Sequence, residues 1–179
     1  MTGASAEKWV LQLCHGYGAP FDDVARQWAA LFKGSEYRVL TVFLTGEPCQ
    51  QVTDLVGSDE TVFLQYDSRE LRGLKRRQIQ DVRRLHAQYQ FTFTVAHRYK
   101  PMYIATHLTG VPVYGVAHAY DVFAGFWRRW FVTRHQQQLQ LIAVSDAVRQ
   151  NILAALPKFT PSRIHTVYNR IDVSAMQPH

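Results

Sequence analysis

Short apolar runs rich in β-branched and aromatic residues recur along the whole chain, and longer mixed segments separate them. Runs of this kind, bounded by Gly, Pro, Asn, Asp and Ser, are typical of buried β-strands. The pattern predicts seven strands, at residues 8–14, 37–44, 61–66, 91–97, 111–117, 140–145 and 163–169.

Amphipathic segments fill most of the intervals between these strands. In the first, Val24, Trp28 and Leu31 share one helical face. The basic segment after the third strand also has an apolar side, formed by Leu71, Leu74, Val82, Leu85 and Tyr89. Ser145 is the predicted N-cap of the last helix, because its hydroxyl can accept a backbone hydrogen bond. Helices are expected at residues 21–34, 71–89, 100–110, 125–138 and 146–156, and a short segment around residues 50–56 separates the second and third strands.

Strands and helices alternate, and the inner strands are apolar without a clean inside–outside alternation. This pattern is typical of a parallel sheet that helices cover on both faces. The chain has 179 residues, which suits one domain with a sizeable core. We therefore predict a single doubly wound, Rossmann-like α/β domain with a mainly parallel sheet of about seven strands. Ligands of such folds bind beyond the carboxyl ends of the strands, here at the loops that begin at His15, His97, His118, Ser145 and Asn169.

Composition narrows the cellular setting. No apolar run approaches the roughly 18 residues that span a bilayer, and the N-terminal "MTGASAEKW" lacks the apolar core of a signal peptide. We therefore expect a cytoplasmic protein. The two cysteines, Cys14 and Cys49, suit a reducing compartment and are predicted to be packed thiols.

The formal net charge of +6 fits nucleic acid, an anionic membrane surface or phosphorylated substrates without choosing among them. Two clusters carry much of it: residues 69–84, and "FWRRWF" at residues 126–131. One interpretation is peripheral attachment to the inner face of the cytoplasmic membrane, with Trp127, Trp130 and Phe131 at the headgroup level. The alternative is that the tryptophans face the core and the arginines face water. No signature of an RNA- or DNA-binding module is present, so nucleic acid is not an expected partner.

Several strand ends carry candidate chemistry. Gly16 and Gly18 in "HGYGAPF" would let a phosphate approach the backbone, or they simply permit a tight turn. The G-x-G-x-x-G pattern is absent, because Phe21 occupies its third glycine position. His97, Arg98 and Lys100 of "AHRYKP" lie at the mouth of the fourth strand, where the two cations could hold an anionic or heavily hydroxylated substrate. The alternative is a solvated loop in which Pro101 simply starts the next helix.

The end of the fifth strand supplies the candidate catalytic residues, His118 and Asp121. A histidine there can donate a hydrogen bond to a sugar hydroxyl, although a lone histidine is more often bonded to a buried carbonyl. The histidines of the chain do not form a metal-binding motif, so no metal site is predicted.

Together these strand ends resemble the N-terminal half of a family-4-type glycosyltransferase with the GT-B architecture. The most specific stretch is "LIAVSDAVRQNILAALPKFTPSRIHTVYNRID", residues 141–172, which is similar to the family's strand ending in V-S, helix, and strand running into N-G-x-D. In this chain Arg170 stands where the family usually has glycine.

The resemblance implies a retaining, metal-independent transferase without a cofactor, since the nucleotide-sugar is a substrate. Gly16 and Gly18 would border the donor diphosphate, and His118 would contact the donor sugar. Asn169 and Asp172 would lie at the hinge side of the cleft and help to hold the donor. The acceptor pocket would be formed by His97, Arg98, Lys100 and Asp121. The acceptor would be lipid-linked or an oligosaccharide, as in bacterial lipopolysaccharide-core synthesis.

The resemblance also implies that residues 1–179 form the acceptor-side domain of a larger enzyme. Its C-terminal, donor-binding domain is expected to be missing from this chain, because nothing like it follows His179. The alternative from another functional class is a non-catalytic α/β module that binds an anionic ligand or nucleic acid.

Overall fold

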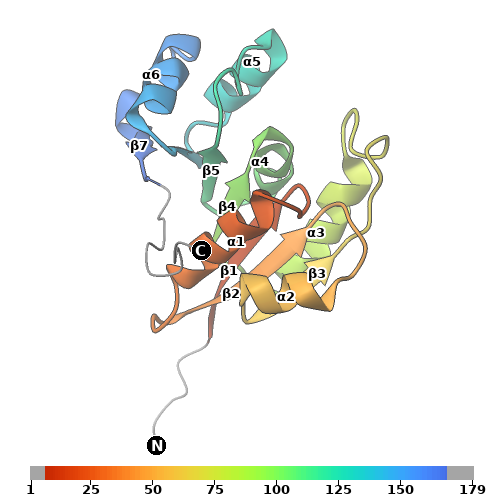
Figure 1. Cartoon of the computed structure of the whole chain (residues 1–179). Helices are drawn as coiled ribbons and strands as arrows, with labels where there is room; N and C mark the ends of the chain where they lie inside the picture. The colour runs from red at the N-terminus through yellow and green to blue at the C-terminus, as the bar shows by residue number, and fades with distance from the viewer. Residues whose placement is uncertain (1–6, 169–179) are drawn as a thin grey trace, which may run out of the picture.

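Seven parallel strands form one sheet in the computed structural model, which describes residues 7–168 (Figure 1). The spatial order of the strands is β3-β2-β1-β4-β5-β6-β7. Their bounds are Lys8–Cys14 (β1), Tyr37–Phe43 (β2), Glu60–Phe63 (β3), Phe93–His97 (β4), Val113–Ala117 (β5), Leu139–Ala143 (β6) and Ile164–Thr166 (β7). The predicted doubly wound fold is confirmed.

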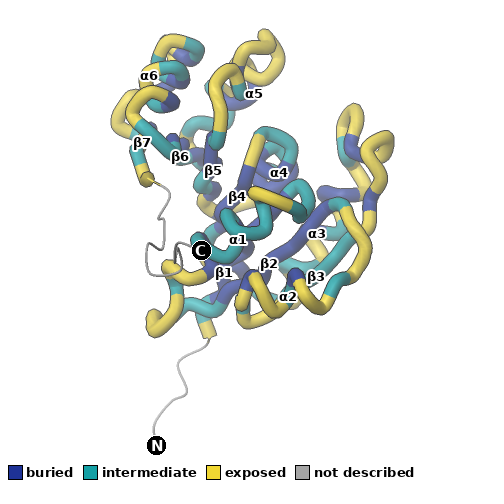
Figure 2. The backbone as a smooth tube through the Cα atoms, viewed as in Figure 1, coloured by how far each residue is buried: buried dark blue, intermediate teal, exposed yellow. Residues whose placement is uncertain are grey.

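Helices cover both faces of this sheet. Their bounds are Phe21–Ala30 (α1), Gln50–Val56 (α2), Arg76–Tyr89 (α3), Tyr99–Ala105 (α4), Phe126–Arg134 (α5) and Asp146–Ala155 (α6), and a 3-10 turn at Pro161–Arg163 precedes β7. Helices α1 and α2 pack on one face, and α3 to α6 pack on the other. Figure 2 shows the strands as the buried layer between them.

Residues that alternate along β1 enter cores on opposite faces. Leu11 and Leu13 pack with the helices α3 and α4, whereas Val10 packs against Trp28 of α1. Because both faces are covered, almost every residue of the strand is buried. This burial explains why residues 9–14 form an apolar run in which Gln12 is the single polar residue.

Several local predictions are confirmed. The hydroxyl of Ser145 accepts a hydrogen bond of 3.2 Å from the Val148 N–H, which caps α6. Cys14 is buried, Cys49 is half-buried, and both are free thiols. In residues 7–168, no helix is long and apolar enough to cross a membrane.

The short segment at residues 50–56 forms the helix α2. Other local predictions are wrong. Leu74 precedes α3 and is exposed, because the backbone at Gly73 and Lys75 has positive φ and delays the helix start to Arg76. Leu31 follows the end of α1 and is exposed as well.

The aromatic cluster of α5 divides between core and solvent. Trp127 and Trp130 are 74% and 54% exposed, so the interpretation that places them in the core is wrong. Phe131 is buried and cannot lie at a membrane surface. Phe126 is exposed beside the two tryptophans. These three exposed side chains are hereafter called the α5 aromatic face.

Candidate functional site

The strand order reverses between β1 and β4, and this reversal opens a crevice at their carboxyl ends. A hollow of about 200 Å³ lies there, lined in part by His15, Gly16, His97 and Arg98. It adjoins a larger groove of about 800 Å³ that shares His15 and Arg98 and extends past His118 toward α5. The loops after β1, β4 and β5 therefore meet, as the sequence predicts.

The two glycines of the first loop have different constraints. A Cβ atom on Gly16 would lie 2.4 Å from Oγ1 of Thr45, whose hydroxyl donates to the His15 carbonyl. Gly16 is therefore required by packing, whether or not a ligand binds. Gly18 has a φ of +103° and open space around the missing side chain. Its backbone conformation favours glycine, and no atom of residues 7–168 lies within 4 Å of the position that a Cβ would take.

His97 and His118 form a hydrogen-bonded pair across the ends of β4 and β5. Nδ1 of His97 lies 3.0 Å from Nε2 of His118. His97 is 4% exposed and lines the smaller hollow, and Trp28 packs edge-on against its ring at 5.5 Å between centroids. His118 is half-buried and lines the larger groove. His97 therefore lines the smaller hollow and hydrogen-bonds to His118. It does not line the larger groove, where the acceptor is predicted to bind.

The hydrogen-bond network of this pair favours one tautomer. Nε2 of His97 is buried and has no hydrogen-bond partner among residues 7–168. A buried N–H without an acceptor is rarer and more costly than a buried lone pair without a donor. The proton of His97 is therefore assigned to Nδ1, which donates to Nε2 of His118. His118 then carries its own proton on Nδ1, where it can donate to a ligand in the groove.

Burial keeps both rings neutral. Burial and, to a smaller extent, the nearby Arg98 guanidinium lower the pKa of His118 to about 4. Burial also lowers the pKa of His97 well below its usual value, with a smaller contribution from His118. At neutral pH the groove therefore presents an uncharged N–H donor at His118.

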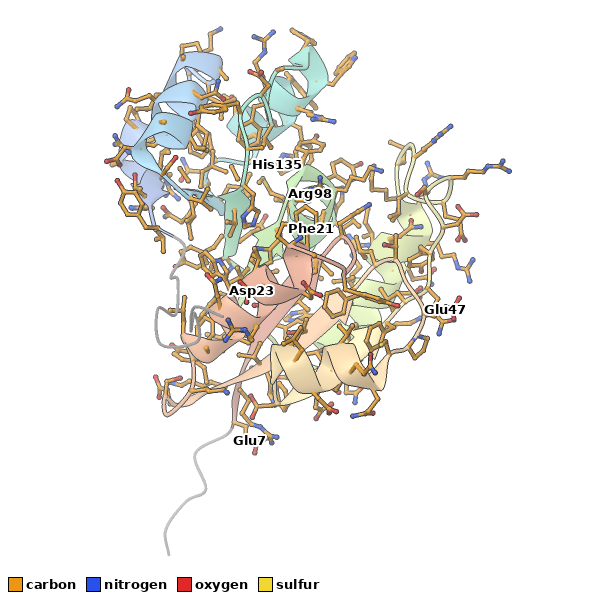
Figure 3. The ribbon with its side chains drawn as sticks, viewed as in Figure 1. Glu7, Phe21, Asp23, Glu47, Arg98 and His135 are labelled. Carbon is orange, nitrogen blue, oxygen red and sulfur yellow. The ribbon has the colours of Figure 1, made fainter. Side chains whose placement is uncertain are left out.

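Arg98 has an unusual backbone conformation at the mouth of the groove, with φ 75° and ψ 168°. This region is populated almost only by glycine and costs other residues about 1–3 kcal/mol. Two backbone hydrogen bonds hold it, from the Arg98 N–H to the Val116 carbonyl and from the Met102 N–H to the Arg98 carbonyl. The guanidinium lies over the Phe21 ring, 4.6 Å from its centroid (Figure 3).

Lys100 and Asp121 line the larger groove, as their predicted acceptor role requires. Asp121 is exposed and has a φ of 58°. Its N–H donates to Oδ1 of Asn151 at 3.0 Å, and Nδ2 of Asn151 donates to its carboxylate at 3.4 Å. This double contact ties the loop after β5 to α6.

Sequence reasoning missed three contributors to the site. Phe21 lies under Arg98, Arg128 lines the larger groove, and Asn151 holds Asp121. Arg128 carried a signal in the "FWRRWF" cluster, but the spacing of that cluster does not show which arginine turns inward. Asn169 and Asp172 lie outside the described residues. Within residues 7–168, no cluster of three His, Cys, Asp or Glu side chains could hold a metal ion.

The sequence profile of Glycosyltransferase Family 4 matches residues 15–175, which is nearly the whole chain. Among curated protein sequences, none matches the chain. The family match favours the transferase class over a non-catalytic binding module.

Solved structures share the fold at low sequence identity. A glycosyltransferase from Rickettsia africae ESF-5 has a TM-score of 0.68 and 12% identity, covering 97% of this chain and 47% of that one. The UDP-GlcNAc 2-epimerase from Neisseria meningitidis, bound to UDP-GlcNAc, has a TM-score of 0.60 and 13% identity, covering 90% and 47%. The UDP-N-acetylglucosamine 2-epimerase from Rickettsia bellii has a TM-score of 0.60 and 9% identity, covering 91% and 45%. The chain spans less than half the length of these structures.

The backbone strain at Arg98 can be measured by comparing two substitutions. Arg98→Gly and Arg98→Ala both remove the guanidinium, but only glycine adopts this φ and ψ without strain. The relief of about 1–3 kcal/mol exceeds the roughly 0.5–1 kcal/mol of extra chain entropy that glycine loses on folding. We therefore expect the glycine variant to be more stable than the alanine variant by about 1 kcal/mol in urea unfolding. Equal stabilities, or a more stable alanine variant, would show that the conformation is not strained.

The neutral histidine pair makes stability depend on pH. In the folded state the pKa values of His97 and His118 are lowered, so the unfolded chain binds more protons as the pH falls below about 6.5. The free energy of unfolding should therefore fall with decreasing pH, by at most about 1.4 kcal/mol per pH unit for each histidine. His118→Gln should flatten this slope between pH 6.5 and about 4, as measured by urea unfolding.

The matched control is His165→Gln, which changes an exposed histidine on β7. It should leave the slope unchanged. A slope that is the same in His118→Gln and in the wild type would contradict the assignment of a neutral His118.

Proposed function

Because the chain belongs to glycosyltransferase family 4, we propose that it is the acceptor-side domain of a retaining glycosyltransferase. In this proposal the enzyme moves a sugar from a nucleotide-sugar to a lipid-linked or oligosaccharide acceptor, in the synthesis of bacterial lipopolysaccharide or another cell-envelope glycan. The observation that carries the proposal is His118, a neutral N–H donor that His97 holds at the edge of the groove.

A neutral donor suits the chemistry of sugar transfer. The bond between the sugar's anomeric carbon and the donor phosphate breaks, and an acceptor hydroxyl forms the new bond on the same face. The leaving phosphate takes the hydroxyl proton, so the reaction needs no protein base. His118 would hold a hydroxyl of the donor sugar by a hydrogen bond that strengthens as charge develops. Gly16 and Gly18 would border the diphosphate, and the proposal includes neither a metal nor a cofactor.

The acceptor would occupy the larger groove beside Arg98, Lys100 and Asp121. Two cations and one carboxylate can bind a hydroxylated, anionic molecule through charge-assisted hydrogen bonds. The hollow and groove offer one wall of a cleft, and the chain matches less than half of each similar structure. These observations support a second, C-terminal domain of the same protein that holds most of the nucleotide-sugar.

The α5 aromatic face supports peripheral attachment to the cytoplasmic membrane, on its inner face. Arg129 is exposed and lines a shallow hollow together with Phe126 and Trp130, and amphipathic aromatics beside cations favour an anionic headgroup layer. Several arginines of the basic segment before and within α3 are less available for contact with a membrane. Arg77 pairs with Glu70, Arg84 pairs with Asp81, and Arg83 donates to the His107 carbonyl.

The transferase proposal predicts how the 179-residue chain behaves alone. It should transfer no sugar, and calorimetry should give a Kd for nucleoside diphosphates no lower than about 0.1 mM, which corresponds to a binding free energy of about −5.5 kcal/mol.

The proposal also predicts the effect of His118 on catalysis. In the longer enzyme that the proposal requires, His118→Ala should lower kcat about 10²–10³-fold, because it removes a donor that acts on developing charge. His165→Ala is the control and should leave kcat unchanged. A low-micromolar nucleotide affinity of this chain alone, or an unchanged kcat in His118→Ala, would show that the donor site lies elsewhere.

Membrane attachment predicts co-sedimentation of the chain with anionic vesicles at low salt, weakened by added salt. Replacing Trp127 and Trp130 together by alanine should lower the bound fraction at least about tenfold, since a buried large apolar side chain contributes roughly 1.5–3 kcal/mol. Leu55→Ala removes an exposed apolar side chain on α2, across the sheet, and should have no effect. If the wild-type chain stays in the supernatant at low salt, the attachment is absent.

A further inference from the structure

Three cations from three separate elements converge beside α4. Lys75 precedes α3, Lys100 lies in the first turn of α4, and Arg128 lies in α5. Figure 1 shows the loop before α3 and the helix α5 on either side of α4. Two neighbouring tyrosines of α4, Tyr99 and Tyr103, contact Arg128 and Lys75, respectively, and Lys100 lies on the same helix, close enough to act on the charge of Lys75.

Cation–π contacts fix two members of this cluster. Nζ of Lys75 lies 4.8 Å from the Tyr103 ring centroid, and Cζ of Arg128 lies 4.9 Å from the Tyr99 ring centroid. The two tyrosine centroids are 6.3 Å apart. Each cation also donates one hydrogen bond to a carbonyl, Lys75 to Gly73 and Arg128 to Val122. An ammonium has three N–H bonds and a guanidinium has five, so further donors remain for a ligand.

The cluster lacks a counter-charge. Among residues 7–168, none of the three cations lies within 4.0 Å of a carboxylate oxygen. Nearby basic residues behave differently, since Arg77 and Arg84 each pair with a carboxylate. Burial lowers the pKa of Lys75, and the charges of Lys100 and Arg128 lower it as well, so both cations repel Lys75. Lys75 is held there with a φ of 50°, a conformation that is uncommon for residues other than glycine.

We propose that Lys75, Lys100 and Arg128 bind a phosphate group of the acceptor at the α5 end of the groove. A phosphate carries up to two negative charges and several acceptor oxygens, which match a planar guanidinium and two point-like ammonium groups. Lys100 and Arg128 line the same groove as His118 and Asp121. Arg128 does not line the hollow beside Gly16, so the site differs from the proposed position of the donor diphosphate.

This inference rests on the proposed function and makes its acceptor more specific. The acceptor should carry a phosphate close to the hydroxyl that receives the sugar. That phosphate has two possible sources with the same chemistry: a phosphorylated sugar of the acceptor or a lipid headgroup. Glucose 6-phosphate and vesicles that contain phosphatidic acid are probes for the first and the second source, respectively.

Glucose 6-phosphate and glucose are titrated against the isotopically labelled 179-residue chain and followed by nuclear magnetic resonance. The phosphate ester should bind and glucose should not. Lys75→Gln and Arg128→Gln should each weaken binding about tenfold or more, as expected for the loss of one hydrogen bond to a charged group. Arg128→Lys, which keeps the charge but loses the planar fork, should weaken binding less and also serves if Arg128→Gln does not fold.

Two neighbouring substitutions are matched controls for net charge. Arg76→Gln and Arg129→Gln remove the same charge from positions adjacent to Lys75 and Arg128, but neither residue lies in the cluster. Both should retain wild-type affinity. If the controls lose as much affinity as Lys75→Gln and Arg128→Gln, the binding reflects only long-range attraction to positive charge, and the proposed site is wrong.

Phosphatidylcholine vesicles with and without phosphatidic acid form the second arm. If binding to phosphatidic acid depends on Lys75 and Arg128 while glucose 6-phosphate does not bind, the recognised phosphate belongs to a lipid headgroup. If neither probe shows that dependence, the proposal is wrong. Such a failure would leave the transferase proposal intact, because kcat of His118→Ala tests that separately.

Discussion

The pairing of β4 between β1 and β5 is the constraint on which the site depends. In this register Leu13 lies opposite Ala96, and His97 lies opposite Val116, two residues before His118. The N–H of Arg98 continues the ladder by donating to the Val116 carbonyl. A one-residue slip would turn His97 to the other face of the sheet and break its hydrogen bond to His118. The apolar cores on both faces oppose such a slip, so the fold itself positions the hydrogen-bond donor.

The charges around the groove follow from the same arrangement. Asp23 borders the groove, but its carboxylate pairs with Arg26 on its own helix. Asp121 is held by Asn151. Arg98 and Arg128 instead lie over aromatic rings, which orient a guanidinium without neutralising it. The groove therefore keeps a net positive character and leaves the neutral His118 to provide directional contact.

Most of the fold could be predicted from the sequence, because buried parallel strands and their alternation with helices leave a strong hydrophobic pattern. Ser145 and His118 were also predictable, since each follows directly from a strand end. The burial of His97 was not, because it depends on the alignment of β4 with β5 and on Trp28 from α1. Nor was the late start of α3 at Arg76: apolar spacing continues through Leu74, and the break comes from backbone conformations at Gly73 and Lys75. The cluster of Lys75, Lys100 and Arg128 joins residues far apart in sequence, and no spacing rule predicts it.

The nine-residue helix α5 shows how helical periodicity combines two surfaces in one short element. Trp127 and Trp130 are three residues apart and share the solvent-exposed side, whereas Phe131 and Val132 are buried in the core. Arg128 lies one turn before Val132, on the side of the helix that faces the domain, and reaches Tyr99 at the groove. A bilayer that contacts the tryptophans would therefore lie against the same helix that extends Arg128 to the groove. Membrane attachment and phosphate recognition are therefore compatible, since both proposals place an anionic group of the acceptor next to α5.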